Sequence, residues 1–214
     1  MSLPDPPLLL ITDRAQAQRP IVDIVTAALV AGCRWVSVRE KDLAAPRQIE
    51  LVKRLLPIVR GFNASLTLHG DPGIARASGA DGVHLPAHGD QARARAELGE
   101  QRLVGISIHS SNDASAVDPA FVDYTIVGPA YASASKPGYS PTLGTAGLQA
   151  LAGAAVVPVI AIGGIEPAVV AEVMACGASG IAVMGGVMRA DDPGATVAAL
   201  LRALAPARNQ PRAR

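Results

Sequence analysis

Short runs of β-forming apolar residues alternate with helical stretches along the chain, and this alternation narrows the choice of fold more than any other feature. The runs predict eight strands, at residues 8–12, 35–39, 66–70, 82–85, 104–108, 124–128, 157–162 and 180–185. Helices are predicted at residues 20–31, 46–60, 72–78, 90–98, 112–118, 145–153, 167–176 and 193–204. The chain therefore reads as a series of βα units.

Three of these units repeat one local pattern. VAGCRWVSV, ASGADGVHL and ACGASGIAV each run from a helix end through a glycine into a strand. Eight units with short loops favour a closed barrel over an open doubly wound sheet, which normally carries a GxGxxG turn after its first strand. No such turn follows LLLIT. The prediction is one α/β domain, a (β/α)8 TIM barrel over residues 8–204, with residues 1–7 and 205–214 as loose tails.

Composition agrees with this fold and argues against several partners. Half of the residues are apolar and only 3% are aromatic, which suits strands of Val, Ile, Leu and Ala buried on both faces. A net charge of +1 makes nucleic acid and anionic membrane surfaces unexpected partners. The longest apolar run, residues 151–165, is shorter than the roughly 20 residues of a membrane span. We expect a cytoplasmic protein with buried Cys33 and Cys176 thiols, and a homo-oligomer is compatible with the sequence.

Polar residues cluster just after the predicted strands. In a TIM barrel the loops that follow the strands form the active face. The polar residues at these positions are Asp13, Arg39, Glu40, Lys41, His69, Asp71, His84, His88, His109, Ser133, Ser135 and Lys136. All four histidines are therefore predicted to lie on one rim of the barrel.

Glycine pairs end the last two predicted strands, Gly163–Gly164 in AIGGI and Gly185–Gly186 in AVMGG. Glycine lets the main chain approach a ligand closely, and helix N-termini attract anions. This is the usual phosphate position in TIM barrels. Tight βα turns are the alternative, and we favour phosphate binding because the pairs occur on adjacent strands.

Two basic segments could add to an anion site. Arg39 and Lys41 in SVREKDL are either a solvated surface pair or contacts for a second anionic group of the substrate. The loop of residues 128–144, rich in Ser, Gly and Pro, carries Lys136 and is either a linker or a mobile lid and anion clamp.

The histidines suggest acid/base chemistry more than a metal site. No HxH or HExxH spacing is present, so no zinc site is expected. His109 in ISIHS is the best candidate for a general acid/base because it follows a strand end directly. A histidine packed at the rim without a catalytic role is the alternative.

Five segments, VREKDL, GADGVHL, GISIHS, VGPAYASASKPGYSPTLG and VIAIGGI, together resemble the thiamine phosphate synthase and TenI superfamily. The resemblance extends from LLLITD to VMGGVM. It implies a TIM barrel whose small-molecule partner is a thiazole phosphate.

The synthase branch of that superfamily joins a pyrimidine diphosphate to the thiazole phosphate with Mg²⁺ at the leaving group. Its Gln-x-Arg-x-Lys corresponds to Ser37, Arg39 and Lys41, its Asn-Asp to His69 and Gly70, and its His-Leu-Gly-Gln-x-Asp to residues 84–89. Both magnesium carboxylates are therefore missing at their aligned positions. A shifted site would need Asp71 and Asp90, each one residue late.

The TenI branch has Asn-Gly after the third strand and Leu-Pro after the fourth, which Gly70 and Leu85–Pro86 match. Its activity is aromatisation of a thiazole phosphate carboxylate, with a histidine at the position of His109 moving the proton. The segment Ser133-Ala-Ser-Lys136, in contrast, resembles the Thr-x-Thr-Lys pyrophosphate clamp of the synthase.

On this resemblance we expect a thiazole tautomerase, an isomerase that needs neither cofactor nor metal. His109 would be catalytic, and Gly163, Gly164, Gly185 and Gly186 would bind phosphate. Further substrate contacts are expected from Arg39, Lys41, His69, Ser133, Ser135 and Lys136. The alternatives are a thiamine-phosphate diphosphorylase with displaced Mg²⁺ ligands and a non-catalytic thiazole phosphate sensor.

Overall fold

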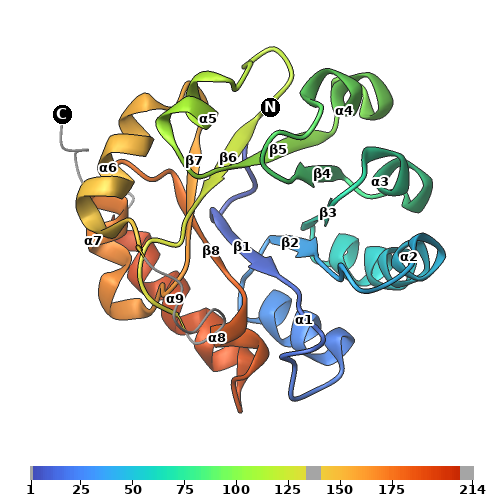
Figure 1. Ribbon diagram of the computed structural model, residues 1–214. Helices are drawn as coiled ribbons and strands as arrows, with labels where there is room; N and C mark the ends of the chain where they lie inside the picture. The colour runs from blue at the N-terminus through green and yellow to red at the C-terminus, as the bar shows by residue number, and fades with distance from the viewer. Residues whose placement is uncertain (1, 134–140, 208–214) are drawn as a thin grey trace.

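The computed structural model describes residues 2–133 and 141–207. Eight parallel strands form a closed barrel with helices around its outside (Figure 1). The strands are β1 (Leu8–Ile11), β2 (Trp35–Val38), β3 (Ser65–His69), β4 (Gly82–Leu85), β5 (Leu103–Ile108), β6 (Tyr124–Val127), β7 (Val159–Ile162) and β8 (Gly180–Val183). Each strand lies within two residues of its predicted limits.

Strand pairing closes the sheet on itself. Each strand pairs in parallel with the next, and β1 also pairs with β8, where Leu9 lies opposite Ala182. On its other side Leu9 lies opposite Trp35 of β2. The predicted (β/α)8 TIM barrel is therefore confirmed.

The connecting helices match the predicted pattern, with one addition. They are α1 (Ile21–Val30), α2 (Ala45–Gly61), α3 (Pro72–Ser78), α4 (Gln91–Leu98), α5 (Ser111–Ser115), α6 (Gly144–Ala154), the 3-10 turn η1 (Pro167–Val169), α7 (Val170–Ala175), α8 (Gly185–Met188) and α9 (Pro193–Ala207). The short α8 directly follows β8 and was not predicted. It begins at Gly185, one of the glycines assigned to phosphate binding.

Buried side chains form two layers, as strands covered on both faces require. Inside the barrel, Leu9, Trp35, Tyr124 and Ile160 pack together, and the Trp35 and Tyr124 ring centroids are 4.7 Å apart in an edge-to-face arrangement. The larger cluster fills the space between the barrel and the helices. Cys33 and Cys176 are buried free thiols, as predicted.

Both ends differ from the expected loose tails. Leu3 packs against the cluster inside the barrel, and the carbonyl of Pro7 accepts a hydrogen bond from the Ile181 N–H at 3.0 Å. Helix α9 continues to Ala207, three residues beyond the predicted boundary, because Leu204 and Ala207 remain buried. Contacts that depend on the folded barrel could not be predicted from local composition.

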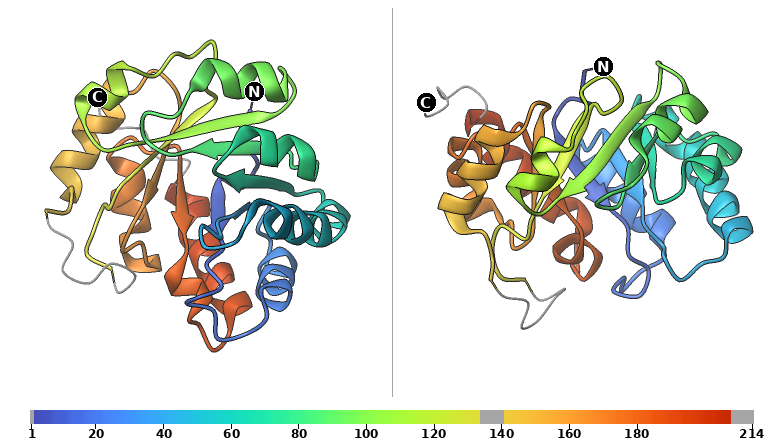
Figure 2. Two further views of the ribbon diagram at one scale, coloured as in Figure 1. Left: turned by 45° about the vertical axis from the view of Figure 1, so that its right-hand side comes forward. Right: turned by 45° about the horizontal axis from the view of Figure 1, so that its top comes forward.

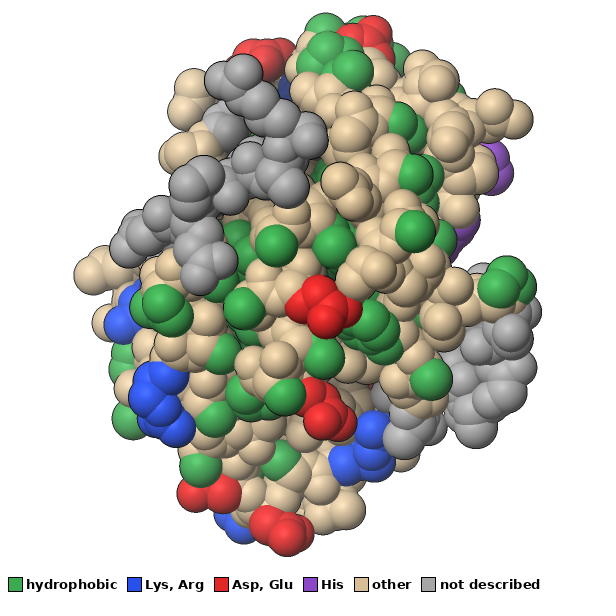
Figure 3. Space-filling view, turned by 90° about the vertical axis from the view of Figure 1, so that its left-hand side faces the viewer, with side chains coloured by type: hydrophobic (Ala, Val, Ile, Leu, Met, Phe, Trp, Pro, Cys, Tyr) green, Lys and Arg blue, Asp and Glu red, His purple; other side chains and the backbone are tan. Residues whose placement is uncertain are grey.

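The loops that follow the strands gather at one end of the barrel. In the right-hand view of Figure 2 the β1–α1 loop and α8 lie at the lower end, whereas the N-terminus lies at the upper end. The face turned toward the viewer in Figure 3 has hydrophobic side chains dispersed among polar atoms. No helix among the described residues has the length and apolar character to cross a membrane.

Candidate functional site

Two of the four histidines, buried His84 and half-buried His69, form a pair at the ends of neighbouring strands. His69 of β3 lies opposite His84 of β4, and their ring centroids are 4.9 Å apart. His84 is 1% exposed, and its Nε2 lies 2.9 Å from the Ser107 hydroxyl oxygen on β5. The Nδ1 atoms of both rings are buried and have no hydrogen-bond partner among the described residues. The pair thus presents polar groups inside the barrel mouth.

Electrostatics keep both imidazoles neutral. Burial, helped by the positive charges of Lys41 and Arg39, lowers the pKa of His69 to about 3. Burial, together with His69 and Lys41, also holds the pKa of His84 well below its usual value. Arg39 and Lys41 follow β2, which pairs with β3 up to Val38 and Leu68, so they leave the barrel beside the end of the strand that carries His69. The mouth therefore combines neutral rings with nearby cations, a setting suited to an anionic ligand.

Glu40 is a buried carboxylate between these two cations in the chain, and the sequence analysis assigned no role to it. It is 3% exposed, and its Oε1 accepts a hydrogen bond from the Thr12 hydroxyl at 2.7 Å. The Arg14 main-chain N–H also donates to Glu40, at 3.0 Å from Oε2. Burial raises the pKa of Glu40, although these hydrogen bonds oppose the effect. The alternation of a strand end could have suggested that Glu40 and Arg39 point in different directions.

His109 and His88 lie apart from the His69–His84 pair, on the exposed rim. The Nδ1 of His109 is 3.2 Å from the carbonyl oxygen of Gly128. A carbonyl only accepts hydrogen bonds, so this contact assigns the proton to Nδ1 and leaves a lone pair on Nε2. Asp113 accepts from the His109 main-chain N–H at 2.8 Å and lies 3.7 Å from His88 Nε2. The predicted single rim is thus divided into an inner and an outer histidine pair.

The first glycine pair forms a turn that side chains would block. Gly163 and Gly164 have φ of +102° and +63°, in the region that favours glycine. A Cβ on Gly163 would lie 2.7 Å from the Cα of Pro129, and one on Gly164 would lie 2.8 Å from the Cβ of Tyr131. The turn therefore packs directly against the start of the loop after β6. Close packing explains these glycines without a ligand, so phosphate binding here stays a prediction.

The second pair has more open surroundings. Gly185 is the buried first residue of α8, whereas Gly186 is exposed. A Cβ on Gly186 would meet no atom within 4 Å. The pair does begin a short extra helix after β8, which is the arrangement that often binds phosphate in TIM barrels.

The two aspartates considered as displaced magnesium ligands cap helices instead. Asp71 accepts from the Ile74 main-chain N–H at 3.1 Å and pairs with Arg93 at 3.0 Å. Asp90 accepts from the Arg93 main-chain N–H at 2.9 Å. Within the described ranges, no three His, Cys, Asp or Glu side chains are placed to share a metal ion. The residues present do not fit a two-carboxylate Mg²⁺ site.

The loop after β6 is only partly described. Ser133 is half-buried, whereas Ser135 and Lys136 lie outside the described residues. The Tyr131 hydroxyl near the start of this loop donates to Glu172 of α7 at 2.5 Å.

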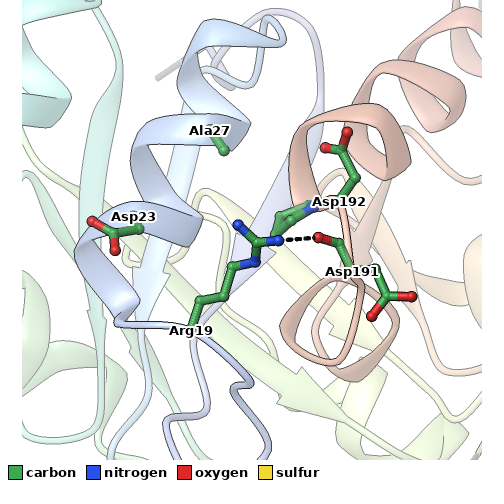
Figure 4. A pocket seen from close by; sticks show the side chains of 6 residues that line it. Arg19, Asp23, Ala27, Asp191 and Asp192 are labelled. Atoms are coloured by element: carbon green, nitrogen blue, oxygen red, sulfur yellow. Dashed lines mark hydrogen bonds between the residues drawn. The ribbon is translucent and has the colours of Figure 1, made fainter.

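A separate groove lies between α1 and the start of α9. Its lining residues are Arg19, Asp23, Ala27, Asp191, Asp192 and Pro193 (Figure 4). Arg19 donates to the carbonyl of Asp191 at 2.6 Å, and Asp192 accepts from the Ala195 main-chain N–H at 2.8 Å. These contacts stabilise the entrance to α9, so the groove is not part of the candidate site.

Comparison with known proteins connects this architecture to a family. The family profile described as thiamine monophosphate synthase matches residues 8–187. A thiamine-phosphate synthase of Herpetosiphon aurantiacus is 39% identical over 170 residues, which cover 79% of this chain and 82% of that protein. One of a Roseiflexus species is 36% identical over 199 residues, which cover 92% and 84%.

A solved structure gives the same result. Thiamine phosphate pyrophosphorylase from Pyrococcus furiosus superposes with a TM-score of 0.81 at 28% identity, and the match covers 94% of this chain and 96% of that one. These relatives are named for the synthase, and nothing in the comparisons favours the TenI branch. The chain belongs to the thiamine monophosphate synthase family.

Proposed function

We propose that this chain is an enzyme of thiamine biosynthesis that binds a thiazole phosphate at the barrel mouth and forms thiamine phosphate. The observation that carries this proposal is the identity of 36–39%, over most of the chain, to proteins named thiamine-phosphate synthase. It replaces our first expectation, a TenI-type tautomerase, as the leading function. The cations near the mouth support it, because both substrates of this reaction are anionic.

The reaction joins the thiazole ring nitrogen to the methylene carbon of the pyrimidine as the carbon–oxygen bond to diphosphate breaks. Negative charge then grows on the departing diphosphate. Arg39 and Lys41 would stabilise that charge, and the glycine turns after β7 and β8 would hold the thiazole phosphate. The neutral His69 and His84 would line the mouth without adding charge. In this family Mg²⁺ assists departure of the diphosphate, but the described residues do not provide its two carboxylates, so no step here depends on a protein-bound metal.

Thiazole tautomerase is the second candidate, and two observations favour it. Gly70 and Gly89 stand where the synthase pattern has carboxylates. His109, protonated on Nδ1, carries a lone pair on Nε2 that could accept a ring proton and return it to the exocyclic carbon. Such a transfer needs no metal.

Two assays on the purified chain separate these reactions. The first supplies pyrimidine diphosphate and thiazole phosphate with Mg²⁺ and measures release of diphosphate, and the second supplies the non-aromatic thiazole phosphate carboxylate and follows aromatisation. Turnover in the first assay supports the leading proposal. Turnover in the second assay alone would replace it with the tautomerase. Binding of thiazole phosphate without either turnover would identify the sensor.

A further inference from the structure

The segment Arg39–Asp42 after β2 alternates basic and acidic side chains, and the bases and the acids interact with different parts of the protein. Arg39 and Lys41 lower the pKa of His69 at the barrel mouth. The carboxylates of Glu40 and Asp42 both contact Arg14, Glu40 at 3.7 Å from Arg14 Nε and Asp42 at Arg14 Nη2. The acids are thus paired with Arg14, while the two bases act on the mouth.

Glu40 connects β1 to β2 through one hydroxyl. The Thr12 hydroxyl donates its only proton to Glu40 at 2.7 Å. Its oxygen lone pair accepts the Arg39 main-chain N–H at 3.1 Å. Because a hydroxyl has one proton, the bond to Glu40 fixes the direction in which Thr12 can accept. Glu40 therefore fixes the main chain from which the Arg39 side chain extends.

The Arg39 side chain extends toward the turn assigned to phosphate binding. Its Nη1 lies 4.0 Å from the Met184 sulfur, and Met184 directly precedes Gly185 and Gly186. In the closed barrel β1 lies between β8 and β2, so the guanidinium spans the end of β1. Contacts from Glu40 through Thr12 to Arg39 thus end beside α8.

We propose that Glu40 is a positioning residue for anion binding, acting through Thr12 to hold the Arg39 guanidinium beside the Gly185–Gly186 turn. The inference rests on the proposed function only in requiring an anionic substrate at the mouth, and it applies to either reaction. Glu40 also stabilises the fold through its hydrogen bonds with Thr12 and Arg14, so the test must separate anion binding from stability.

The test measures binding of inorganic phosphate and of diphosphate by calorimetry, well below the melting temperature of each variant. Glu40→Gln keeps the shape and removes the charge, and Thr12→Val removes the hydroxyl. Both variants should weaken anion binding by about tenfold, the effect of losing one well-placed charged contact. Glu40→Gln should also lower the melting temperature, because its amide nitrogen cannot accept the hydrogen bond that Glu40 Oε2 accepts from the Arg14 main-chain N–H.

Two controls make the result specific. Thr12→Ser keeps the hydroxyl and should restore binding. Glu50→Gln makes the same chemical change at an exposed carboxylate, paired at 2.8 Å with Arg47 on α2, and should bind anions like the native chain.

The other possible results would each contradict one part of the proposal. Native affinity in Glu40→Gln or Thr12→Val would overturn the positioning role while leaving the proposed function intact. Failure of Thr12→Ser to recover binding lost in Thr12→Val would overturn the route through the hydroxyl. If the native chain binds neither anion, this inference fails, while the proposed function is still decided by the turnover assays.

Discussion

Single residues at the mouth differ mainly in burial, and burial decides what each histidine can do. His84 is buried, His69 is half-buried, and both have lowered pKa values, so they suit recognition of a ligand more than proton transfer near neutral pH. His109 is exposed and has a defined proton position. The candidate for acid/base chemistry is therefore the histidine on the outer rim.

Replacing His109 by Asn tests this role. If the chain aromatises the thiazole, the rate should fall by about 10² to 10⁴, the usual contribution of a general acid/base, while substrate binding changes little. Steady-state kinetics with kcat and KM measured separately provide the check, and His88→Asn serves as the control on the same rim. An unaltered kcat in His109→Asn would assign the proton transfer to another group.

The lowered pKa of His69 predicts how stability depends on pH. The unfolded chain takes up a proton near pH 6.5, whereas folded His69 does not until about pH 3. The free energy of unfolding therefore falls as the pH drops between these values, by about 1.4 kcal/mol per unit. Urea unfolding of the native chain and of His69→Gln at pH 7.5 and 5.5 should show a loss about 1.4 kcal/mol smaller in the variant. Equal losses would mean that His69 titrates normally.

At the scale of elements, the turn after β7 requires glycine at Gly163 and Gly164. At Gly164, with φ +63°, a methyl group would collide with the carbonyl of Ala132 and the side chain of Tyr131. Gly164→Ala should therefore cost about 1–3 kcal/mol of stability and weaken phosphate binding. Gly153→Ala is the matched control, because it is exposed within α6 and its Cβ would meet nothing within 4 Å. Urea unfolding should show Gly153→Ala at least as stable as the native chain.

Helices α3 and α4 explain the two aspartates that follow β3 and β4. Asp71→Ala and Asp90→Ala should each lower the free energy of unfolding by about 1 kcal/mol, because each removes an N-cap. Catalysis should retain its original Mg²⁺ dependence in both variants. A rise in the Mg²⁺ concentration needed for half-maximal rate would show that one of these carboxylates binds the metal after all.

At the scale of the whole molecule, the barrel could be predicted from sequence because each βα unit carries its own local signal. Strands such as LLLI are buried on both faces and read as continuous apolar runs. The short α8 has only four residues, too few for a periodic pattern. The His69–His84 pair and the burial of Glu40 depend on the register between strands, which one sequence does not specify. Asp71 could have been recognised as a cap, since it directly precedes the predicted helix 72–78, whereas Asp90 falls inside the predicted helix 90–98 and caps a helix that begins at Gln91.

Ligand linkage gives a test that involves the entire fold. A ligand that binds only the folded chain at 100 times its dissociation constant stabilises it by about 2.7 kcal/mol. For a chain of this size each kcal/mol raises Tm by about 2–4 °C, so saturating thiazole phosphate should raise Tm by about 5–10 °C.

Mg²⁺ alone should leave Tm unchanged, because Gly70 and Gly89 offer no carboxylates and Asp71 and Asp90 already cap helices. Thermal unfolding followed by circular dichroism, with NaCl at matched ionic strength, distinguishes specific binding from a general salt effect. A clear rise in Tm with Mg²⁺ alone would require metal ligands elsewhere on the chain and would restore the metal-bound form of the synthase mechanism.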